Sequence, residues 1–582
     1  MMRGSTTTAN SSGHRYKYVT EEKAGGATFT PKKLADFVAR QIVANLNAPV
    51  NEVVRVIDPA VGEGALLVSL LDELVSHGFR RVEVTGFDTN PSSLASAQTT
   101  LRTKFSSATI ELRCGDFLEY AEQSVSRVPS LFRSVPPERF HVVIANPPYV
   151  RTQVMGAAHA QSLASHFGLS GRVDLYHAFI LAMIEILDQN GIAGIIVSNR
   201  FMTTRSGAAV RRLLRESVCI KHIWDLGDTR LFDAAVLPAV LLVTKEKQTR
   251  ANGKAIFTSI YETDAPADRQ AQDVIEALAE PGTVRVRDGR HFKVTHGKLS
   301  SGAAPDGIWR VATDKGDEWL QRVERHTWRN FGAAGGIRVG IKTCADNVFI
   351  RSDWMNMPES ERPELLRPLI THHIGRRFKA LQLEETYQVL YPHVLRDGRR
   401  EAADLAIFPR AAAYLEKHRL TLEGRSYVAE AGRRWYEIWV PQDPGAWNLP
   451  KIVFRDISQA PTFWMDLDGS VVNGDCYWMA LGRDLDVNVL WLALAVANSS
   501  FIEAFYDHRF HNKLYAGRRR FMTQYVEQFP LPDPSGQESA KMIELAKQIY
   551  DLLPAPSAHE LESHLDSLVW RAFGVSVEEL RR

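Results

Sequence analysis

One short run of residues combines hydrogen-bond acceptors, stiff backbone and an aromatic ring. Val142, Val143 and Ile144 are apolar and β-branched, which predicts a buried strand. At its carboxyl end stand Asn146, Pro147, Pro148 and Tyr149. The Asn146 side-chain oxygen and the Pro147 carbonyl are two acceptors, and proline stiffens the second because it fixes φ. Two acceptors aimed at one amino group orient its hydrogens and leave the nitrogen lone pair for reaction. The run therefore suits methylation of an exocyclic amine on a ring held by Tyr149, although a simple end to the strand is the alternative.

Acidic residues and glycines follow three strand-like stretches that come earlier in the chain. Glycine lets the backbone approach a ligand, and the helix that follows offers unpaired N–H groups. An acid about twenty residues beyond a glycine turn can accept hydrogen bonds from ribose hydroxyls. At the ends of successive strands these residues predict one elongated pocket for a nucleoside-bearing cofactor. They are Asp58, Ala60, Gly62 and Gly64 after the first strand, Asp88 after the second, and Asp116 and Phe117 after the third.

Strand-like and helix-like stretches alternate between residues 29 and 248, which predicts an α/β fold with a doubly wound, mainly parallel sheet. A helix over residues 29–46 should begin near Thr30-Pro31, and a long apolar helix should cover residues 174–191. Residues 220–245 read as the closing strands. In such sheets the ligand lies at the carboxyl ends of the strands, where the acids and the Asn146 run are expected.

The chain of 582 residues is too long for one hydrophobic core. We expect a polar tail over residues 1–28, a catalytic domain over residues 29–248 and a linker or insertion over residues 249–308. A second domain of α+β character, rich in tryptophan and tyrosine, should cover residues 309–535. Residues 536–582 are expected to form two amphipathic helices.

The composition excludes some classes of protein and leaves others open. Apolar residues make up 45% and charged residues 24% of the chain, which is typical of a globular protein, and no apolar run is long enough to predict a membrane partner. The four cysteines are scattered, which favours reduced thiols in a cytoplasm and no metal site. The pair His372 and His373 has no further ligand at metal-binding spacing.

A net charge of +2 does not by itself announce a nucleic-acid partner, so a DNA surface would need local clustering. Residues 508–521 are the main candidate, because basic residues there are interleaved with aromatic ones. A solvated basic face is the alternative reading, and residues 372–379 are a weaker second strip. The candidate phosphate-binding residues are Arg509, Lys513, Arg518, Arg519 and Arg520.

The order of the motifs resembles one enzyme family. The blocks FTPKKLADF, DPAVGEG, GFDTNP, GDF, NPPY, DLYHAF and LGDTRLFDAAVLPAVLLV occur as they do in γ-class N6-adenine DNA methyltransferases of type II restriction–modification systems. The resemblance covers about residues 28–248. It implies a Rossmann-like, S-adenosylmethionine-dependent methyltransferase domain followed by a C-terminal α+β target-recognition domain. Residues 336–350, 473–481 and 529–534 resemble that second region more loosely.

The resemblance also implies a role for each cofactor-binding residue. Thr30 and the turn at residues 58–64 would hold the methionine part of S-adenosylmethionine. Asp88 would bind the ribose, and Asp116 with Phe117 would hold the adenine of the cofactor. Within the turn, Val61 and Glu63 stand where the family often has cysteine and serine.

For the substrate, the resemblance implies that Asn146 and Pro147 bind the target N6 and that Tyr149 stacks on an adenine swung out of double-stranded DNA. Phe232 falls where the family has a second aromatic residue on the other face of that base. The expected partners are double-stranded DNA and, as a genetic companion, a separate restriction endonuclease of the same specificity.

Three other activities stay open at this point. The same catalytic domain could act on an RNA adenine or a protein glutamine, because Asn-Pro-Pro-Tyr also occurs in those families. The chain could be a bifunctional restriction–modification enzyme, or a DNA-binding module with a decayed cofactor site. The recognition sequence cannot be read from the residues.

Overall fold

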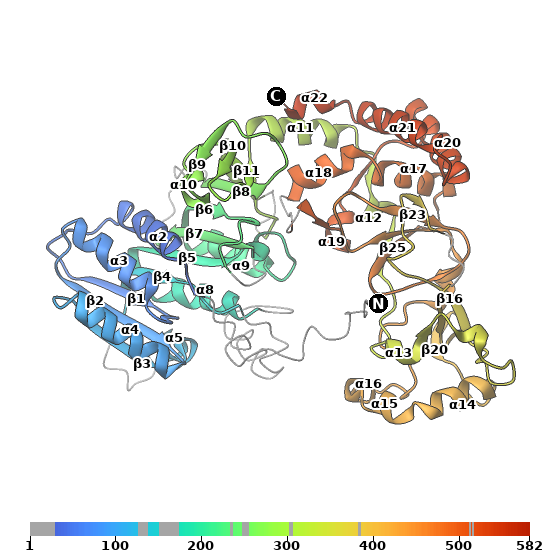
Figure 1. Ribbon diagram of the computed structural model, residues 1–582, viewed down its shortest axis with the longest axis horizontal. Helices are drawn as coiled ribbons and strands as arrows, with labels where there is room; N and C mark the ends of the chain where they lie inside the picture. The colour runs from blue at the N-terminus through green and yellow to red at the C-terminus, as the bar shows by residue number, and fades with distance from the viewer. Residues whose placement is uncertain are drawn as a thin grey trace, which may run out of the picture. The chain divides into compact units, whose positions relative to one another are not determined.

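The computed structural model describes residues 29–125, 138–149, 174–232, 237–246, 255–301, 306–381, 386–482, 484–510, 514 and 517–581. The chain divides into two compact units, Met1–Thr313 and Asp314–Arg582 (Figure 1). We call them the catalytic unit and the C-terminal unit and describe each by itself.

A twelve-stranded sheet, counted over the described residues, forms the centre of the catalytic unit, with strand order β3-β2-β1-β4-β5-β7-β6-β8-β11-β10-β9 and β12 beside β11. Neighbouring strands from β3 to β5 are parallel, and β7 lies antiparallel between β5 and β6. The mainly parallel sheet predicted from the alternation of elements is therefore present in the first half. The strands are β1 (Val54–Asp58), β2 (Val82–Asp88), β3 (Thr109–Cys114), β4 (Phe140–Ala145), β5 (Leu187–Ser198), β6 (Cys219–Asp225), β7 (Pro238–Thr244), β8 (Ile256–Glu262), β9 (Arg269–Ala271), β10 (Gly282–Val286), β11 (His291–Ser300) and β12 (Arg310–Ala312).

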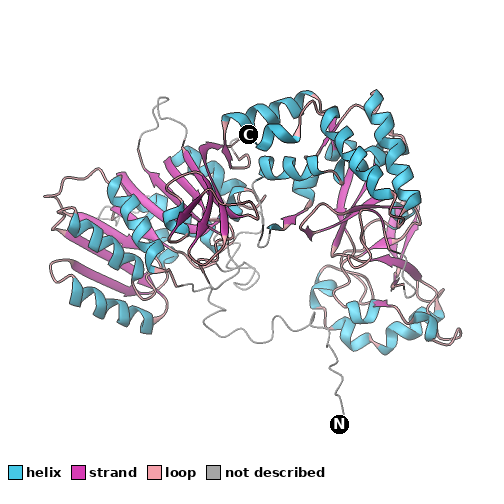
Figure 2. Ribbon diagram, turned by 45° about the horizontal axis from the view of Figure 1, so that its top comes forward, coloured by secondary structure: helices cyan, strands magenta, loops and turns pink. Residues whose placement is uncertain are grey.

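Helices cover both faces of this sheet, which makes each central strand apolar on both sides (Figure 2). In β1, Val56 belongs to one core cluster and Ile57 to the other, as alternation along a strand requires. The first cluster includes α2 (Lys32–Ala44), α3 (Ala65–Ser76) and α4 (Pro91–Lys104). The second includes α5 (Phe117–Val125), α8 (Leu175–Ile186) and α9 (Ala208–Ser217).

Helix α2 packs unusually closely on β5. A Cβ on Gly194 would lie 2.7 Å from Ile42 Cδ1 and 2.9 Å from Val38 Cγ1, so only glycine leaves room for the helix. The predicted start of this helix is confirmed, since Pro31 precedes its first residue. The close packing of α2 on β5 thus sets the position of the helix that Pro31 leads into.

Two predicted boundaries were wrong. The helix expected over residues 174–191 ends at Ile186, because Leu187 is already extended (ψ 134°) and pairs with Phe140 in the sheet. The described part of residues 249–308 does not form a linker, one of the two expectations for this segment, while an insertion stays a prediction. Strands β8 to β11 continue the sheet, with β8 parallel to β6 and antiparallel to β11, so this segment buries apolar side chains such as Phe257 and Phe292.

The C-terminal unit contains a five-stranded sheet, β14-β25-β21-β23-β17, and a four-stranded sheet, β15-β18-β16-β24. Two loosely recognised sequence blocks meet here, since β14 and β25 pair antiparallel with Ile337 opposite Met479. The strands are β14 (Gly335–Val339), β25 (Cys476–Leu481), β21 (Lys451–Arg455), β23 (Phe463–Asp466), β17 (Phe378–Lys379), β15 (Ile350–Arg351), β18 (Gln388–Leu390), β16 (Leu366–Ile370) and β24 (Val471–Val472).

Helices complete the C-terminal unit. The two helices predicted after residue 536 are confirmed as α20 (Gln537–Leu552) and α21 (Ala558–Ala572), and both pack on α17 (Val487–Ala497). Trp319 on α11 (Asp314–Arg325) lies against Trp570 of α21 and Phe501 of α18 (Ser500–Phe510).

No single helix in the described part of the chain is long and apolar enough to cross a membrane. Helices α17 and α18 reach that length and apolarity only as a pair, which is bent by 74°. Residues 489–497 of α17 are buried inside the C-terminal unit.

A buried arginine on α9 connects the segment at residues 306–307 with the turn that precedes α9. Arg211 on α9 is 3% exposed, and its guanidinium donates to the carbonyls of Phe201 (2.6 Å), Thr204 (2.8 Å), Asp306 (2.6 Å) and Gly307 (2.8 Å). These bonds join segments about a hundred residues apart in the chain.

Arg211→Met should lower the free energy of unfolding of the catalytic unit by about 3 kcal/mol, because methionine fills the space but leaves buried carbonyls without donors. Chemical denaturation checks this, with Arg212→Met, an exposed position on the same helix, as the control. Equal stability of the two variants would contradict it.

Candidate active site

The Asn146 carboxamide lies between two hydroxyl groups at the carboxyl end of β4. Its Nδ2 donates to Thr30 Oγ1 at 3.0 Å, and its Oδ1 accepts from the Tyr149 hydroxyl at 2.9 Å. The side chain is 9% exposed. The carbonyl oxygen of the amide is thus turned toward the ring predicted to hold the substrate.

Tyr149 is held as a neutral hydrogen-bond donor. Burial raises the pKa of its phenol well above the usual range, so the hydroxyl keeps its proton. The ring packs edge-on against Tyr176 of α8 at 6.1 Å between centroids. Tyr176 in turn contacts His177, whose two ring nitrogens are buried and have no hydrogen-bond partner among the described residues.

The glycine turn after β1 brings two acids to one place. Gly62 and Gly64 have φ of +53° and +86°, which a side chain would disfavour. This backbone allows the Gly62 N–H to donate to Asp88 Oδ2 at 2.7 Å, which links the ends of β1 and β2. The Ala60 N–H donates to Asp58 Oδ1 at 3.0 Å.

Asp58 is a buried carboxylate that lacks one partner. Its Oδ2 has no hydrogen-bond donor within the described residues, and the side chain is fully buried. Burial raises its pKa to about 7, and the nearby charge of Asp88 adds to this. A cation supplied by a ligand would satisfy this oxygen, and the ammonium of a methionine moiety is such a cation.

The third strand end carries Asp116 and Phe117. Asp116 Oδ1 accepts from the Leu118 N–H at 2.8 Å at the start of α5. Phe117 is 1% exposed and packs against Phe87 and Phe179, so its ring lies in the core rather than on an open surface.

Strand order and register bring these side chains to one edge of the sheet. β1 lies between β2 and β4, and β3 flanks β2. Asp58 is opposite Gly86, and Asp88 is opposite Cys114, so successive parallel strands end at similar levels. The residues singled out in the sequence therefore follow neighbouring strands along the edge β3-β2-β1-β4, and the elongated pocket between them stays a prediction.

Phe232 follows β6 and is not at the strand ends of the edge β3-β2-β1-β4. It is 7% exposed and belongs to the core cluster on the α2 face, whereas Tyr149 packs against the cluster on the other face. Stacking of Phe232 on a base stays a prediction, and it would require this side chain to leave the core.

A buried polar network at the end of β6 was not recognised from the sequence. Asp225 Oδ2 accepts from the Tyr261 hydroxyl at 2.7 Å, and Oδ1 accepts from Asn199 Nδ2 at 3.0 Å and from the Gly227 N–H at 3.2 Å. Burial raises the pKa of Asp225 to about 6. The network anchors the loop that leads to Phe232, and the run Asp225-Leu-Gly-Asp228 after an apolar strand was the signal.

The basic strip at residues 508–521 divides into exposed and buried members. Arg509 and Arg518 are exposed, and Lys513 lies outside the described residues. Arg519 is 5% exposed, and its guanidinium bonds to both oxygens of Asp507 at 2.7 Å. Arg520 pairs with Asp456 at 3.1 Å. Arg519 and Arg520 are paired with acids of the same unit. Arg509 and Arg518 are therefore the better candidates for phosphate contact among the described residues.

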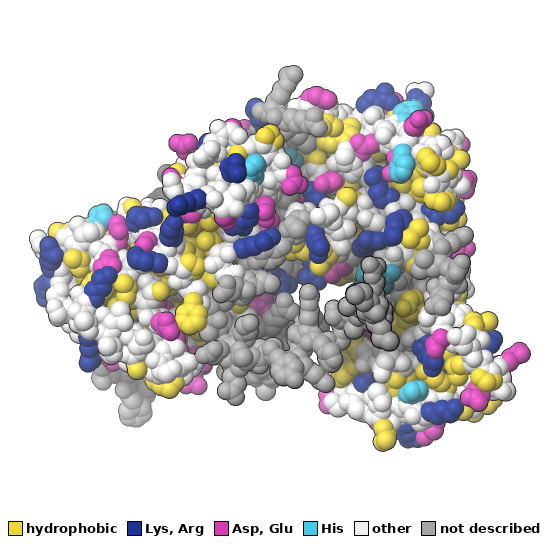
Figure 3. Space-filling model, in the orientation of Figure 1, with side chains coloured by type: hydrophobic (Ala, Val, Ile, Leu, Met, Phe, Trp, Pro, Cys, Tyr) yellow, Lys and Arg dark blue, Asp and Glu magenta, His cyan; other side chains and the backbone are white. Residues whose placement is uncertain are grey.

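Charge elsewhere gives no single basic face in the view of Figure 3, where acidic and basic side chains are interspersed. Nor does any group of three or more His, Cys, Asp or Glu in the described ranges have the arrangement of a metal site. His372 instead bonds to Asp475 through Nδ1 at 2.5 Å.

Two protein-family models match the chain. Residues 83–232 match the Eco57I restriction-modification methylase family, and residues 412–531 match the TaqI-like C-terminal specificity domain. The first match spans β2 to β6 with the Asn146 run, and the second lies within the C-terminal unit.

A solved structure shares the fold over most of the chain. A nuclease-deletion mutant of the type ISP restriction–modification enzyme LlaGI, solved with a DNA substrate mimic, aligns with a TM-score of 0.51 at 12% identity. The alignment covers 90% of this chain and 47% of that one.

Curated relatives match from end to end. The type II methyltransferase M.PaeR7I of Pseudomonas aeruginosa is 24% identical over 96% of this chain and 93% of its own length. The type II methyltransferase M.BanIII of Aneurinibacillus aneurinilyticus is 36% identical over 95% of this chain and 98% of its own. With the methyltransferase-like sheet and the specificity-domain match, this similarity shows that the chain belongs to the type II methyltransferases of restriction–modification systems.

Proposed function

We propose that the protein transfers a methyl group from S-adenosylmethionine to N6 of an adenine in double-stranded DNA. The observation that carries the proposal is the Asn146 carboxamide, held by Thr30 and Tyr149 at the strand edge that also bears Asp58 and Asp88.

Asn146 would recognise the target amine through its carbonyl oxygen. An amide oxygen can accept two hydrogen bonds, so its bond from Tyr149 is compatible with a second from an N6 hydrogen. The Pro147 carbonyl would accept the other hydrogen. Both acceptors favour an amine whose lone pair points away from them, and none of these groups needs to be ionised.

The cofactor fits the residues at the ends of β1, β2 and β3. The unpartnered Asp58 oxygen suits the ammonium of the methionine moiety, Asp88 suits the ribose, and Asp116 would accept from the adenine amino group. The Phe117 ring packs in the core, so a contact of this ring with the adenine would require it to move. When bound, S-adenosylmethionine supplies a methyl group on a positively charged sulfur. The protein's part is to place the amine in line with that methyl group and to exclude water.

The target base must leave the duplex to reach Asn146, because N6 is paired and stacked in DNA. Extrusion costs a few kcal/mol. Stacking on Tyr149, and on Phe232 if that side chain leaves the core, would return roughly 1–3 kcal/mol per base. The TaqI-like region would read the sequence, with Arg509 and Arg518 neutralising phosphates.

The biological role would be protection of DNA from a separate endonuclease of the same specificity. The type II relatives support this role. The similarity to the type II restriction enzyme and methyltransferase RM.Eco57I spans only 19% of this chain, so it supports a shared methylase segment alone. The cytoplasm, where the four free cysteines would stay reduced, is the proposed compartment.

DNA from cells that express the protein should contain N6-methyladenine in one short sequence context, and DNA from cells that express Asn146→Ala should not. Alanine removes the side-chain acceptor, so we expect transfer to fall at least a thousandfold while cofactor and DNA binding stay near normal. Single-molecule sequencing of modified bases compares the N6-methyladenine content of the two DNA preparations. Methylation of RNA or protein but not DNA, or normal turnover by the variant, would overturn the proposal.

Asp58→Asn should bind the cofactor at least tenfold more weakly, because a neutral amide cannot pair with the ammonium. The same substitution should stabilise the cofactor-free protein at neutral and higher pH. The pKa of Asp58 is raised to about 7, so the native state binds this proton more tightly than the unfolded chain does. The free energy of unfolding of the wild type therefore falls as the pH rises from about 4 to about 7.

Since asparagine keeps the acceptor for Ala60 but brings one unpaired donor, the cofactor-free variant should be about 1–2 kcal/mol more stable than the wild type at pH 8 and not at pH 4. Calorimetric titration and denaturation at both pH values check these effects. Asp225→Asn, another buried acid of the same unit, should leave cofactor affinity unchanged. Normal cofactor affinity in Asp58→Asn would contradict the assignment.

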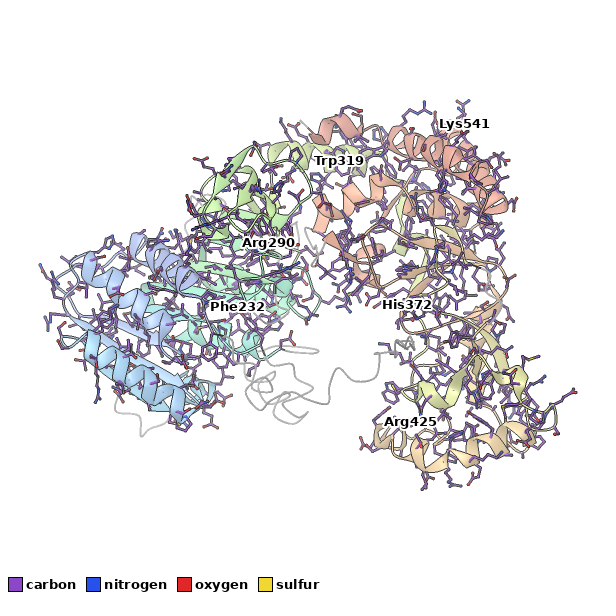
Figure 4. The ribbon with its side chains drawn as sticks, viewed as in Figure 1. Phe232, Arg290, Trp319, His372, Arg425 and Lys541 are labelled. Atoms are coloured by element: carbon purple, nitrogen blue, oxygen red, sulfur yellow. The ribbon has the colours of Figure 1, made fainter. Side chains whose placement is uncertain are left out.

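Arg518→Ala should weaken DNA binding several-fold for every sequence and reduce the slope of log K against log salt by about one. A phosphate contact adds affinity without reading bases. Fluorescence anisotropy over a salt series tests this, and Lys541→Ala, at an exposed position on α20 (Figure 4), is the control. An unchanged salt slope would show that Arg518 is only a solvated charge.

A further inference from the structure

The side chain that fixes Asn146 belongs to a part of the chain that is 116 residues earlier. Thr30 Oγ1 is the acceptor for Asn146 Nδ2, at 3.0 Å. The family resemblance gives Thr30 a role toward the cofactor, whereas this contact is with the residue proposed to bind the target amine.

Thr30 is held rigidly enough to serve as a reference point. A residue that precedes proline is restricted to extended conformations, and Pro31 follows it directly. Pro31 leads into α2, which is fixed on the sheet by buried Leu34 and Val38 and by close packing over Gly194. The backbone that carries the Thr30 hydroxyl is therefore fixed by the fold of the catalytic unit.

The two hydroxyls also decide which way the amide faces. A phenol is a better donor than acceptor, and burial keeps Tyr149 protonated, so the oxygen of the amide prefers the Tyr149 side. The NH₂ group then needs an acceptor on the other side, and Thr30 provides it. Loss of the Thr30 hydroxyl would remove the hydrogen bond that holds the NH₂ group on this side of the amide.

We infer that Thr30 is a positioning residue for the methyl transfer: through its hydrogen bond to Nδ2 it keeps Asn146 Oδ1 directed at the target amine. The inference rests on the proposed function of Asn146. A reversed amide would present two donors to the donor hydrogens of N6, and the amine would lose its orientation. Thr30 thereby acts on the rate of transfer rather than on affinity for the cofactor.

The test compares Thr30→Val, which keeps the shape but loses the hydroxyl, with Thr30→Ser, which restores it. Single-turnover methylation of a DNA duplex at saturating cofactor should be at least tenfold slower for Thr30→Val and within threefold of wild type for Thr30→Ser. Calorimetric affinity for S-adenosylhomocysteine should stay within threefold for both. Ser69→Ala, which removes the hydroxyl bond from α3 to Asp36 of α2, is the matched control and should keep the wild-type rate.

A double variant provides a second measurement. If Thr30 and Tyr149 act through the same amide, the rate loss of Thr30→Val with Tyr149→Phe should be clearly smaller than the product of the single losses. Multiplied losses would mean that the two residues act independently, which contradicts the inference.

Other results of these experiments would separate a failure of the Thr30 inference from a failure of the proposed function. A weaker affinity of Thr30→Val for S-adenosylhomocysteine with a normal saturated rate would make Thr30 a cofactor ligand and overturn the inference, as would an unchanged rate. Should the valine variant lose its cooperative thermal transition, Thr30→Ala takes its place under the same criteria. Absence of DNA methylation by the wild type itself would refute the proposed function instead.

Discussion

The geometry of the candidate active site depends on one side-chain amide at the end of a buried strand. Asn146 is nearly buried, so both ends of its carboxamide need partners, and Thr30 and Tyr149 provide them from two separate parts of the chain. A neutral amide is suited to this place. It can orient an amine by accepting hydrogen bonds, and it brings no charge that burial would penalise.

Two buried acids of the catalytic unit, Asp58 and Asp225, do carry a group whose charge burial penalises. Asp58 is fully buried, has one oxygen without a donor among the described residues and carries a raised pKa. Such a group destabilises the ligand-free protein at neutral pH, and a bound cation would relieve it. Asp225 is also buried with a raised pKa, yet its oxygens accept from Tyr261, Asn199 and Gly227. The contrast is consistent with the proposed role of Asp58 toward the cofactor and with a structural role for Asp225.

The arginines of the C-terminal unit make a similar distinction. Residues 518–520 are three consecutive arginines, but only the first is exposed, while Arg519 and Arg520 bond to Asp507 and Asp456. A run of positive charge in a sequence therefore does not measure the charge that a surface offers to DNA. The acids that neutralise it can come from other elements.

The sequence alone determined the parallel half of the sheet and the residues that stand at the carboxyl ends of its strands, and the roles of those residues are proposals. These features follow from local patterns: apolar strands covered on both faces, glycine turns, and a strand that ends in Asn-Pro-Pro-Tyr. Tertiary structure alone decided the contact of Thr30 with Asn146, the unpartnered oxygen of Asp58, the burial of Arg519 and the extension of the sheet by residues 256–300. Each of these depends on which distant segments pack together, and no periodicity within one segment records its neighbours in space.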